Sequence, residues 1–185
     1  MSGAWSIRRA SRNDATVLAE LRYRFRAEQH APTEPPEAFL ERCTAWMASR
    51  LDGGRWGAWI AEAEGRAIGA IWLQLIEKLP NPGPELEWHG YVTSAYVAPE
   101  WRNAGVGAAL LDAALAACRA HGVDSVILWP TARSASLYRR FGFRDRPADI
   151  MELVLHPGRA ATMGGPDRPP EGDQPGGERR QLPSP

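Results

Sequence analysis

The feature that most constrains this chain is a strand that turns through glycines into a helix in the middle of the sequence. Residues 91–97 are rich in tyrosine, valine and threonine, as strands commonly are. Pro99 ends the predicted strand because it has no N–H group to donate to a neighbouring strand. Apolar residues recur at helical spacing over 106–117, which predicts a helix there. The turn between the two elements is residues 102–108, here called the glycine loop.

The glycine loop has the properties of an anion-binding site. The first N–H groups of a helix have no acceptor inside that helix, and the helix dipole adds positive potential at the same end. Gly105 and Gly107 carry no Cβ, so a phosphate can approach the backbone closely. Arg102 adds a fixed positive charge beside them. We therefore expect a diphosphate to bind here.

Two common diphosphate motifs fit this loop poorly. A dinucleotide-binding fingerprint needs a third glycine at position 110, where this chain has Leu110. It also needs an acidic residue at the end of the following strand, but Asp124 precedes that strand. A nucleotide-binding P-loop needs Gly-Lys-Ser/Thr, which does not occur here. A nucleotide diphosphate is therefore the disfavoured ligand.

The run Val-x-Pro-Glu-x-Arg-Asn-x-Gly-x-Gly, residues 97–107, resembles the coenzyme A pyrophosphate loop of the GNAT superfamily of acyl-CoA-dependent N-acyltransferases. A second motif, Leu-Tyr-x-x-x-Gly-Phe at residues 137–143, resembles the other characteristic motif of that family. Both occur in the family's order, with the expected elements between them. The chain therefore resembles a bacterial single-domain GNAT acetyltransferase over about residues 7–155.

Length and composition agree with a single enzyme domain. A chain of 185 residues suits one domain with a substantial core. Its formal net charge of +0 favours neither nucleic acid nor an anionic membrane as a partner. The two cysteines are far apart, and the amino terminus has no signal-peptide pattern, so we expect a cytoplasmic protein without a disulfide framework.

The resemblance implies an α/β (α+β) fold, with a mixed central sheet of about seven strands flanked by about four helices. We expect this domain to span residues 1–156, and the Pro/Gly-rich segment 157–185 to be a disordered tail. The three arginines of the first helix (Arg22, Arg24 and Arg26) are expected to face solvent. The predicted strands are 5–9, 56–63, 66–77, 87 or 88 to 97, 124–129, 143–146 and 150–156, and the predicted helices begin after Asp14 and cover 37–51, 106–120 and 134–141.

The resemblance also implies how acetyl-CoA, the acyl donor, would bind. The strand ending at Val97 and the parallel strand 124–129 would splay apart, and the pantetheine arm would pair with backbone groups near Tyr96 and Val97. Thr131 stands where many relatives have an asparagine that touches this arm, and threonine has a shorter reach. The pyrophosphate would lie on the N–H groups of the glycine loop, which are those of Arg102, Asn103, Ala104, Gly105, Val106, Gly107 and Ala108.

Acetyl transfer to an amine needs a donor for the oxyanion, an acid for the leaving thiolate and a neutral amine. The Val97 N–H is the expected oxyanion donor. Tyr138, in the second motif, is the expected acid and is also expected to contact the cofactor. Strand alternation, counted back from Val97, puts His89 and Glu87 on one side as candidate general bases. A chain of water molecules without a single base is the alternative.

The expected reaction moves an acetyl group from acetyl-CoA to a primary amine by direct transfer in a ternary complex. The acceptor is a small-molecule or peptide amine, bound by loops 29–36 and 79–87. Four acidic residues around these loops mildly favour a cationic acceptor: Glu28, Glu34, Glu85 and Glu87. No cluster has metal-ligand spacing, so no metal is expected. A non-catalytic acyl-CoA sensor is the alternative function, and a homodimer is left open.

Overall fold

The computed structural model describes residues 4–145, which contain a mixed five-stranded sheet in the order β1-β2-β3-β4-β5. The first four strands are antiparallel, and β5 runs parallel to β4. The strands are β1 (Trp5–Arg9), β2 (Trp56–Ala63), β3 (Arg66–Glu77), β4 (Trp88–Val97) and β5 (Ser125–Ile127), and the helices are α1 (Ala15–Ala27), α2 (Pro36–Leu51), α3 (Val106–His121) and α4 (Ala135–Arg140), with short 3-10 turns at Arg12–Asp14 and Pro99–Trp101.

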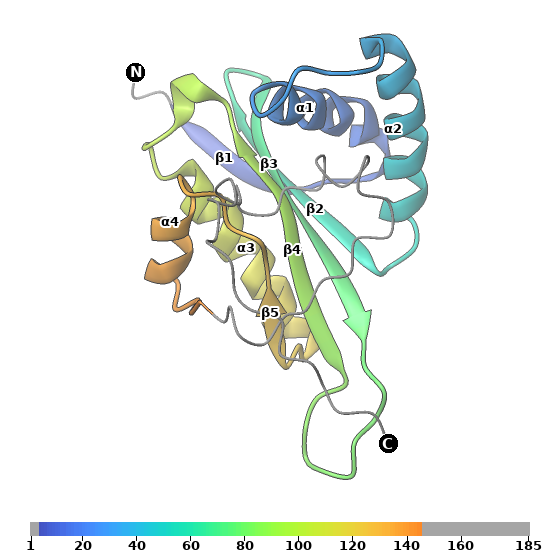
Figure 1. Cartoon of the computed structure of the whole chain (residues 1–185), viewed down its shortest axis with the longest axis vertical. Coiled ribbons are helices and arrows are strands. Elements are labelled where there is room, and N and C mark those ends of the chain that lie inside the picture. The colour runs from blue at the N-terminus through green and yellow to red at the C-terminus, as the bar shows by residue number, and fades with distance from the viewer. Residues whose placement is uncertain (1–3, 146–185) are drawn as a thin grey trace, which may run out of the picture. The chain divides into compact units, whose positions relative to one another are not determined.

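The described residues fall into two compact units, one ending at Leu128 and one beginning at Trp129. The sheet and α1 to α3 belong to the first unit, and α4 belongs to the second. In the first unit, α1 and α2 cover one face of the sheet and α3 covers the other (Figure 1). The glycine loop therefore leads from β4 to the helix that covers the second face of the sheet.

The structure confirms the predicted mixed α/β fold class, and β2, β3 and β4 begin and end as the sequence predicts. The described residues contain five strands rather than about seven. Phe143–Asp145 form no strand, and Asp145 instead bonds back to Arg139 of α4 at 2.9 Å. The predicted strand 150–156, the domain end at 156 and the predicted tail 157–185 lie outside the described residues.

The sequence predicts that Asp14 caps the start of α1, but the structure stabilises this helix start in another way. Asp14 occupies the N-cap position of α1, but its side chain makes no capping hydrogen bond to that helix. Its carboxylate instead accepts bonds from the Arg8 guanidinium at 2.6 and 2.9 Å and from the Ser11 N–H at 2.7 Å. The Arg8 guanidinium holds the pKa of Asp14 well below its usual range. These bonds tie the end of β1 to the start of α1.

An extra residue in β4 changes which side chains share a face of the sheet. Trp72 of β3 lies opposite Thr93, whereas Ala70 lies opposite Tyr96, so β4 carries a bulge between them. Ser94 in this bulge has a left-handed backbone with φ of 55°. Cross-strand partners share a face, so His89, Tyr91, Thr93 and Tyr96 face α1 and α2, whereas Val97 pairs with Gly69 on the face of α3. The predicted alternation, which put Val97 on the side of Thr93 and His89, was wrong because of this bulge.

Gly69 allows β3 and β4 to approach each other just before the glycine loop. A Cβ at this position would lie 2.6 Å from the carbonyl oxygen of Tyr96. We expect Gly69→Ala to lower the free energy of unfolding by about 1–3 kcal/mol, because the backbone of β4 must move to relieve the contact. Gly83→Ala is the matched control, since a Cβ there meets nothing within 4 Å. Urea unfolding of both variants tests this, and equal loss in both would contradict it.

Candidate active site

The two parallel strands of the sheet, β4 and β5, stop pairing before β4 ends. β4 pairs with β5 only from His89 to Tyr91, and β4 then continues to Val97. The Ala98 N–H donates to the Ile68 carbonyl of β3 at 2.8 Å. Because hydrogen-bonding directions alternate along an antiparallel strand, the N–H and C=O of Val97 point away from β3. Within residues 4–145, the end of β4 thus extends beyond its pairing with β5, as the predicted splayed pair requires, and the Val97 N–H points away from β3.

The glycine loop leads directly from this edge into α3. Asn103 and Gly105 have left-handed backbones with φ of 61° and 83°, and α3 begins at Val106. The Ala109 N–H donates to the Gly105 carbonyl at 3.1 Å and is the helix donor that bonds back into the loop. The N–H groups of Val106, Gly107 and Ala108 therefore have no acceptor within the helix. Left-handed residues directly before a helix are typical of loops whose N–H groups bind an anion, which is the kind of ligand that the sequence predicts here.

Arg102 is held by the first unit rather than extended into solvent. Its Nε donates to the Val97 carbonyl at 3.0 Å, and its Nη2 pairs with the Glu28 carboxylate at 2.5 Å. The Tyr96 hydroxyl donates to the same carboxylate at 3.0 Å. The structure thus brings together Tyr96, Val97 and Arg102, all predicted site residues. The structure also places Glu28 in this group. From the sequence, Glu28 is predicted only as an acid near the acceptor loops, because it lies just beyond the end of α1 and no pattern links it to Arg102.

The bonds around Tyr96 predict a loss of stability at high pH. Burial, and then the hydrogen bond to Glu28, raises the pKa of Tyr96 to about 12. The folded chain therefore keeps this proton more tightly than the unfolded chain, in which tyrosine ionises near pH ~10. We expect the free energy of unfolding to fall as the pH rises from about 10 to about 12. Tyr96→Phe should show a smaller fall in urea melts over this range, and an unchanged fall would contradict this.

The two candidate bases lie near the start of β4. The His89 ring nitrogen Nδ1 is 2.6 Å from the Ser125 hydroxyl at the start of β5. Glu87 is exposed in the loop before β4, and its carbonyl accepts a bond from the Lys78 N–H at 2.7 Å. At the usual rise per residue of an extended strand, His89 stands roughly 26 Å along β4 from Val97. The structure does not bring either residue to the end of β4.

Three of the four acids predicted around the acceptor loops are paired with basic groups, which weakens the expected preference for a cationic acceptor. Glu28 binds Arg102, as described above, and Glu34 binds Arg42 at 2.5 Å. Glu85 binds Lys78 at 3.2 Å, and Asn81 also donates to it. The hydrogen bonds from Asn81 and Lys78 keep the pKa of Glu85 below its usual value. These pairs cancel the negative charge that would have attracted a cationic acceptor.

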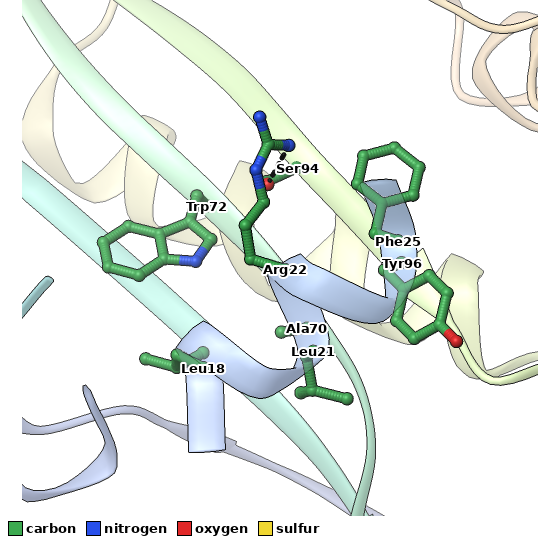
Figure 2. Close-up of a pocket in the computed structure, with 8 residues that line it drawn as sticks. All are labelled: Leu18, Leu21, Arg22, Phe25, Ala70, Trp72, Ser94 and Tyr96. Atoms are coloured by element: carbon green, nitrogen blue, oxygen red, sulfur yellow. Dashed lines mark hydrogen bonds between the residues drawn. The ribbon is translucent and has the colours of Figure 1, made fainter. Parts of the chain in front are cut away.

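Of the three arginines of α1 that were predicted to face solvent, only Arg24 is exposed. Arg24 is exposed and lies 4.0 Å from Glu20, as expected. Arg22, in contrast, points between the helix and β4, where its Nη1 donates to the Ser94 hydroxyl at 2.9 Å (Figure 2). Arg26 is also half-buried and donates to Gln29 at 2.9 Å. Arg22 lies four residues after the buried Leu18, so helical spacing could have placed it on the inner face.

The second unit, which is described by itself, carries the second motif. Tyr138 of α4 is buried and packs edge-on against Phe143, with ring centroids 5.7 Å apart. Burial raises the pKa of Tyr138, and a hydrogen bond with Ser134 offsets part of this rise. The Thr131 hydroxyl lies 2.9 Å from the Ser134 hydroxyl, so the group predicted to touch the cofactor is already bonded within the turn before α4.

Over residues 4–145, no three histidine, cysteine or acidic side chains gather as a metal site would require. Within the same residues, no helix has both the length and the apolar character needed to cross a membrane. Cys43 and Cys118 are free thiols, and burial raises the pKa of both.

Comparison with solved structures gives the same fold. A predicted acetyltransferase with acetyl-CoA from Clostridium acetobutylicum is 22% identical, with a TM-score of 0.73 over 82% of this chain and 97% of that one. A GCN5-related N-acetyltransferase from Ralstonia eutropha JMP134 is 25% identical, with a TM-score of 0.70 over 83% and 100%. Glucosamine-6-phosphate N-acetyltransferase from Arabidopsis thaliana is 18% identical, with a TM-score of 0.61 over 81% and 98%.

A comparison with curated protein sequences gives no match. The sequence model of the acetyltransferase (GNAT) family, however, matches residues 18–143. That range includes most of α1, the whole of β2 to β5, the glycine loop and the second motif. With the end of β4 leading into an amide-lined loop, the match shows that this chain belongs to the GNAT family of acetyltransferases and is an acyltransferase enzyme.

Proposed function

We propose that the protein transfers an acetyl group from acetyl-CoA to a primary amine directly, within a ternary complex of enzyme and both substrates. The observation that carries this proposal is the end of β4 at Val97, which extends past its pairing with β5 and is followed, after the 3-10 turn Pro99–Trp101, by the glycine loop. This layout matches an acyl donor that must place its diphosphate on the glycine loop and its thioester at the end of β4. The acetyl-CoA in the similar Clostridium structure and the N-acetyltransferase from Ralstonia support the same donor and reaction.

The glycine loop would hold the pyrophosphate through the N–H groups from Arg102 to Ala108. The backbone groups near Tyr96 and Val97 would pair with the pantetheine arm as a strand would. Arg102 uses Nε and Nη2 to bind the Val97 carbonyl and the Glu28 carboxylate, so a phosphate contact would come from its remaining N–H groups. An arginine can make this further contact because its planar head has five donors.

The chemistry needs little beyond well-placed donors. The Val97 N–H, which points away from β3, would donate to the oxyanion that forms when the amine attacks the thioester. Tyr138 would protonate the departing thiolate. A phenol of pKa ~10 can serve a thiol of pKa ~8.5, because the transfer costs about 2 kcal/mol. Its raised pKa keeps Tyr138 protonated through the physiological range.

The amine must also lose a proton, and His89 and Glu87 stay predictions for this role. Their distance from Val97 along β4 favours a water chain over direct contact. We therefore expect His89→Ala and Glu87→Ala each to keep kcat/KM within about threefold, with the pH profile of the parent enzyme. Initial rates from pH 6 to 10 test this. If either variant no longer shows the fall in kcat/KM at low pH that protonation of a general base causes, that residue is the base.

The acceptor remains a proposal of class alone: a primary amine on a small molecule or peptide. A cytoplasmic location and a homodimer also stay predictions. The direct test is release of free thiol from acetyl-CoA by the full chain against a library of primary amines, with each acetylated product identified by mass spectrometry. Amine-dependent thiol release with matching product supports the proposal. Tight binding of acetyl-CoA without any acetylated amine would instead favour a sensor.

A further inference from the structure

The proposed reaction gives no role to the half-buried guanidinium of Arg22. Its side chain runs from α1 to the bulge of β4, between Trp72 and Phe25 (Figure 2). Nη1 donates to the Ser94 hydroxyl at 2.9 Å, and the guanidinium carbon is 5.6 Å from the centre of the Phe25 ring. Arg22 is thus held against the strand that ends at the proposed thioester site.

The charge of Arg22 is not balanced within the described residues. Arg8, Arg24 and Arg102 each pair with a carboxylate, whereas Arg22 forms no ion pair with any described acidic group. Arg26, one turn further along α1, adds positive charge rather than removing it. A guanidinium has five N–H donors, and a partly desolvated one gains strongly from a hydrogen bond to an anion.

The space beside Arg22 decides what kind of anion fits. The hollow between α1 and the sheet has a free volume of about 10 Å³, which is the room of about one water molecule. One oxygen of an anion can take that place, and so small a space favours a planar carboxylate over the bulkier tetrahedral head of a phosphate monoester. The apolar wall of Leu21, Ala70 and Trp72 would tighten an ion pair by keeping water away.

The position of the hollow along β4 links it to the reaction. Ser94, which binds Arg22, precedes Val97 by roughly 10 Å of extended strand. The left-handed backbone of Ser94 turns its side chain toward α1 at the bulge, so the hydroxyl and the guanidinium face the same space. A short acceptor could therefore place its amine at the thioester and its anionic end at Arg22.

We propose that Arg22 binds the carboxylate of the acceptor, so that the enzyme acetylates small primary amines that also carry a carboxylate. This proposal rests on the acetyl transfer proposed above and names its substrate class. Arg22 acts here as a specificity-determining residue that touches the acceptor and takes no part in the chemical step.

The test uses amino acids with the amine and the carboxylate one to five carbons apart, each compared with its methyl ester. Wild type, Arg22→Met, Arg22→Lys and Arg24→Met are assayed with acetyl-CoA. Esterification also changes the pKa of the amine, so the quantity to compare between variants is the ratio of kcat/KM for acid and ester. Arg24 is the matched control, because it lies on the same helix but is exposed.

We expect Arg22→Met to lower kcat/KM for the acids about 100-fold, mainly through KM, because a charged hydrogen-bonded contact is lost. Rates with the esters should change little. Arg22→Lys keeps the charge but loses the planar array of guanidinium N–H donors, so we expect kcat/KM for the acids to fall about tenfold. Arg24→Met should leave both rates unchanged. Thermal melting identifies a variant that fails to fold, and the Lys variant then carries the test alone.

An acid-to-ester ratio that is the same in wild type and in the folded Arg22 variants would overturn the proposal. So would a wild-type enzyme that acetylates the esters but not the acids. In both cases acetyl transfer itself would stand. If acetyl-CoA binds but neither set of amines is acetylated, the proposed function fails and this inference fails with it.

Discussion

Gly107→Asp should abolish measurable binding of acetyl-CoA while leaving the protein folded and at least as stable. Gly107 lies in the first turn of α3, directly after the N-terminal residue Val106. A carboxylate there would stand against the proposed pyrophosphate, and like charges brought together cost several kcal/mol. We expect Kd to rise at least about 100-fold, since each 1.4 kcal/mol is a factor of ten. Isothermal calorimetry with acetyl-CoA measures this directly.

The same substitution should not harm the helix, which makes the result easy to interpret. An acidic residue in the first turn of a helix is favourable by about 0.3–1 kcal/mol, and loss of a helical glycine adds a similar amount. We therefore expect the melting temperature to be unchanged or higher. Gly107→Asn is the matched control, because it has the same shape without the charge and should cost far less affinity. Equal affinity of the Asp variant and wild type would remove the loop from the binding site.

Tyr138→Phe should lower kcat about 100-fold with little change in KM, because a general acid acts in the transition state and not in substrate binding. Phenylalanine keeps the buried ring and its contact with Phe143, so the fold should survive. Tyr23→Phe is the matched control. Tyr23 is a half-buried tyrosine that packs against Phe39 in the first unit, and loss of its hydroxyl should leave kcat unchanged.

The pH dependence gives a second readout of the same residue. Burial raises the pKa of Tyr138, so its acid form should persist above the ordinary tyrosine range. We expect kcat of the wild type to hold until about pH 10 and to fall only beyond it. The Tyr138→Phe enzyme should lack this fall. A Phe variant that turns over at the parent rate would show that Tyr138 packs the second unit without serving as the acid.

The sequence predicted those parts of the fold that depend on local chemistry. Two apolar runs joined by a tight hairpin turn predicted β2 and β3 with their observed ends. Glycine at 105 has the left-handed backbone that a turn into a helix uses, so the glycine loop could also be predicted in place. In each case the residues that set the structure are neighbours in the sequence.

What could not be predicted depends on partners far away in the chain. The bulge at Ser94 arises from the pairing of β4 with β3, and a single extra residue exchanged the faces that alternation had assigned. Arg102 is bound by Glu28 across more than seventy residues of sequence. Arg22 lies at helical spacing from Leu18, but its charge favoured a solvent-facing prediction. In the structure Arg22 instead lies between α1 and β4, and the inferred contact with the acceptor depends on this position.

The most direct measurement is the response of backbone amides when acetyl-CoA and acetylpantetheine, which lacks the diphosphate, are titrated into the 15N-labelled chain. Acetyl-CoA should shift the amide signals of Val97 and of residues 105–108 more than any others. Acetylpantetheine should shift Val97 and leave residues 105–108 in place, because only the diphosphate reaches the loop. Unmoved loop amides at saturating acetyl-CoA, or the same loop shifts with both ligands, would contradict the account.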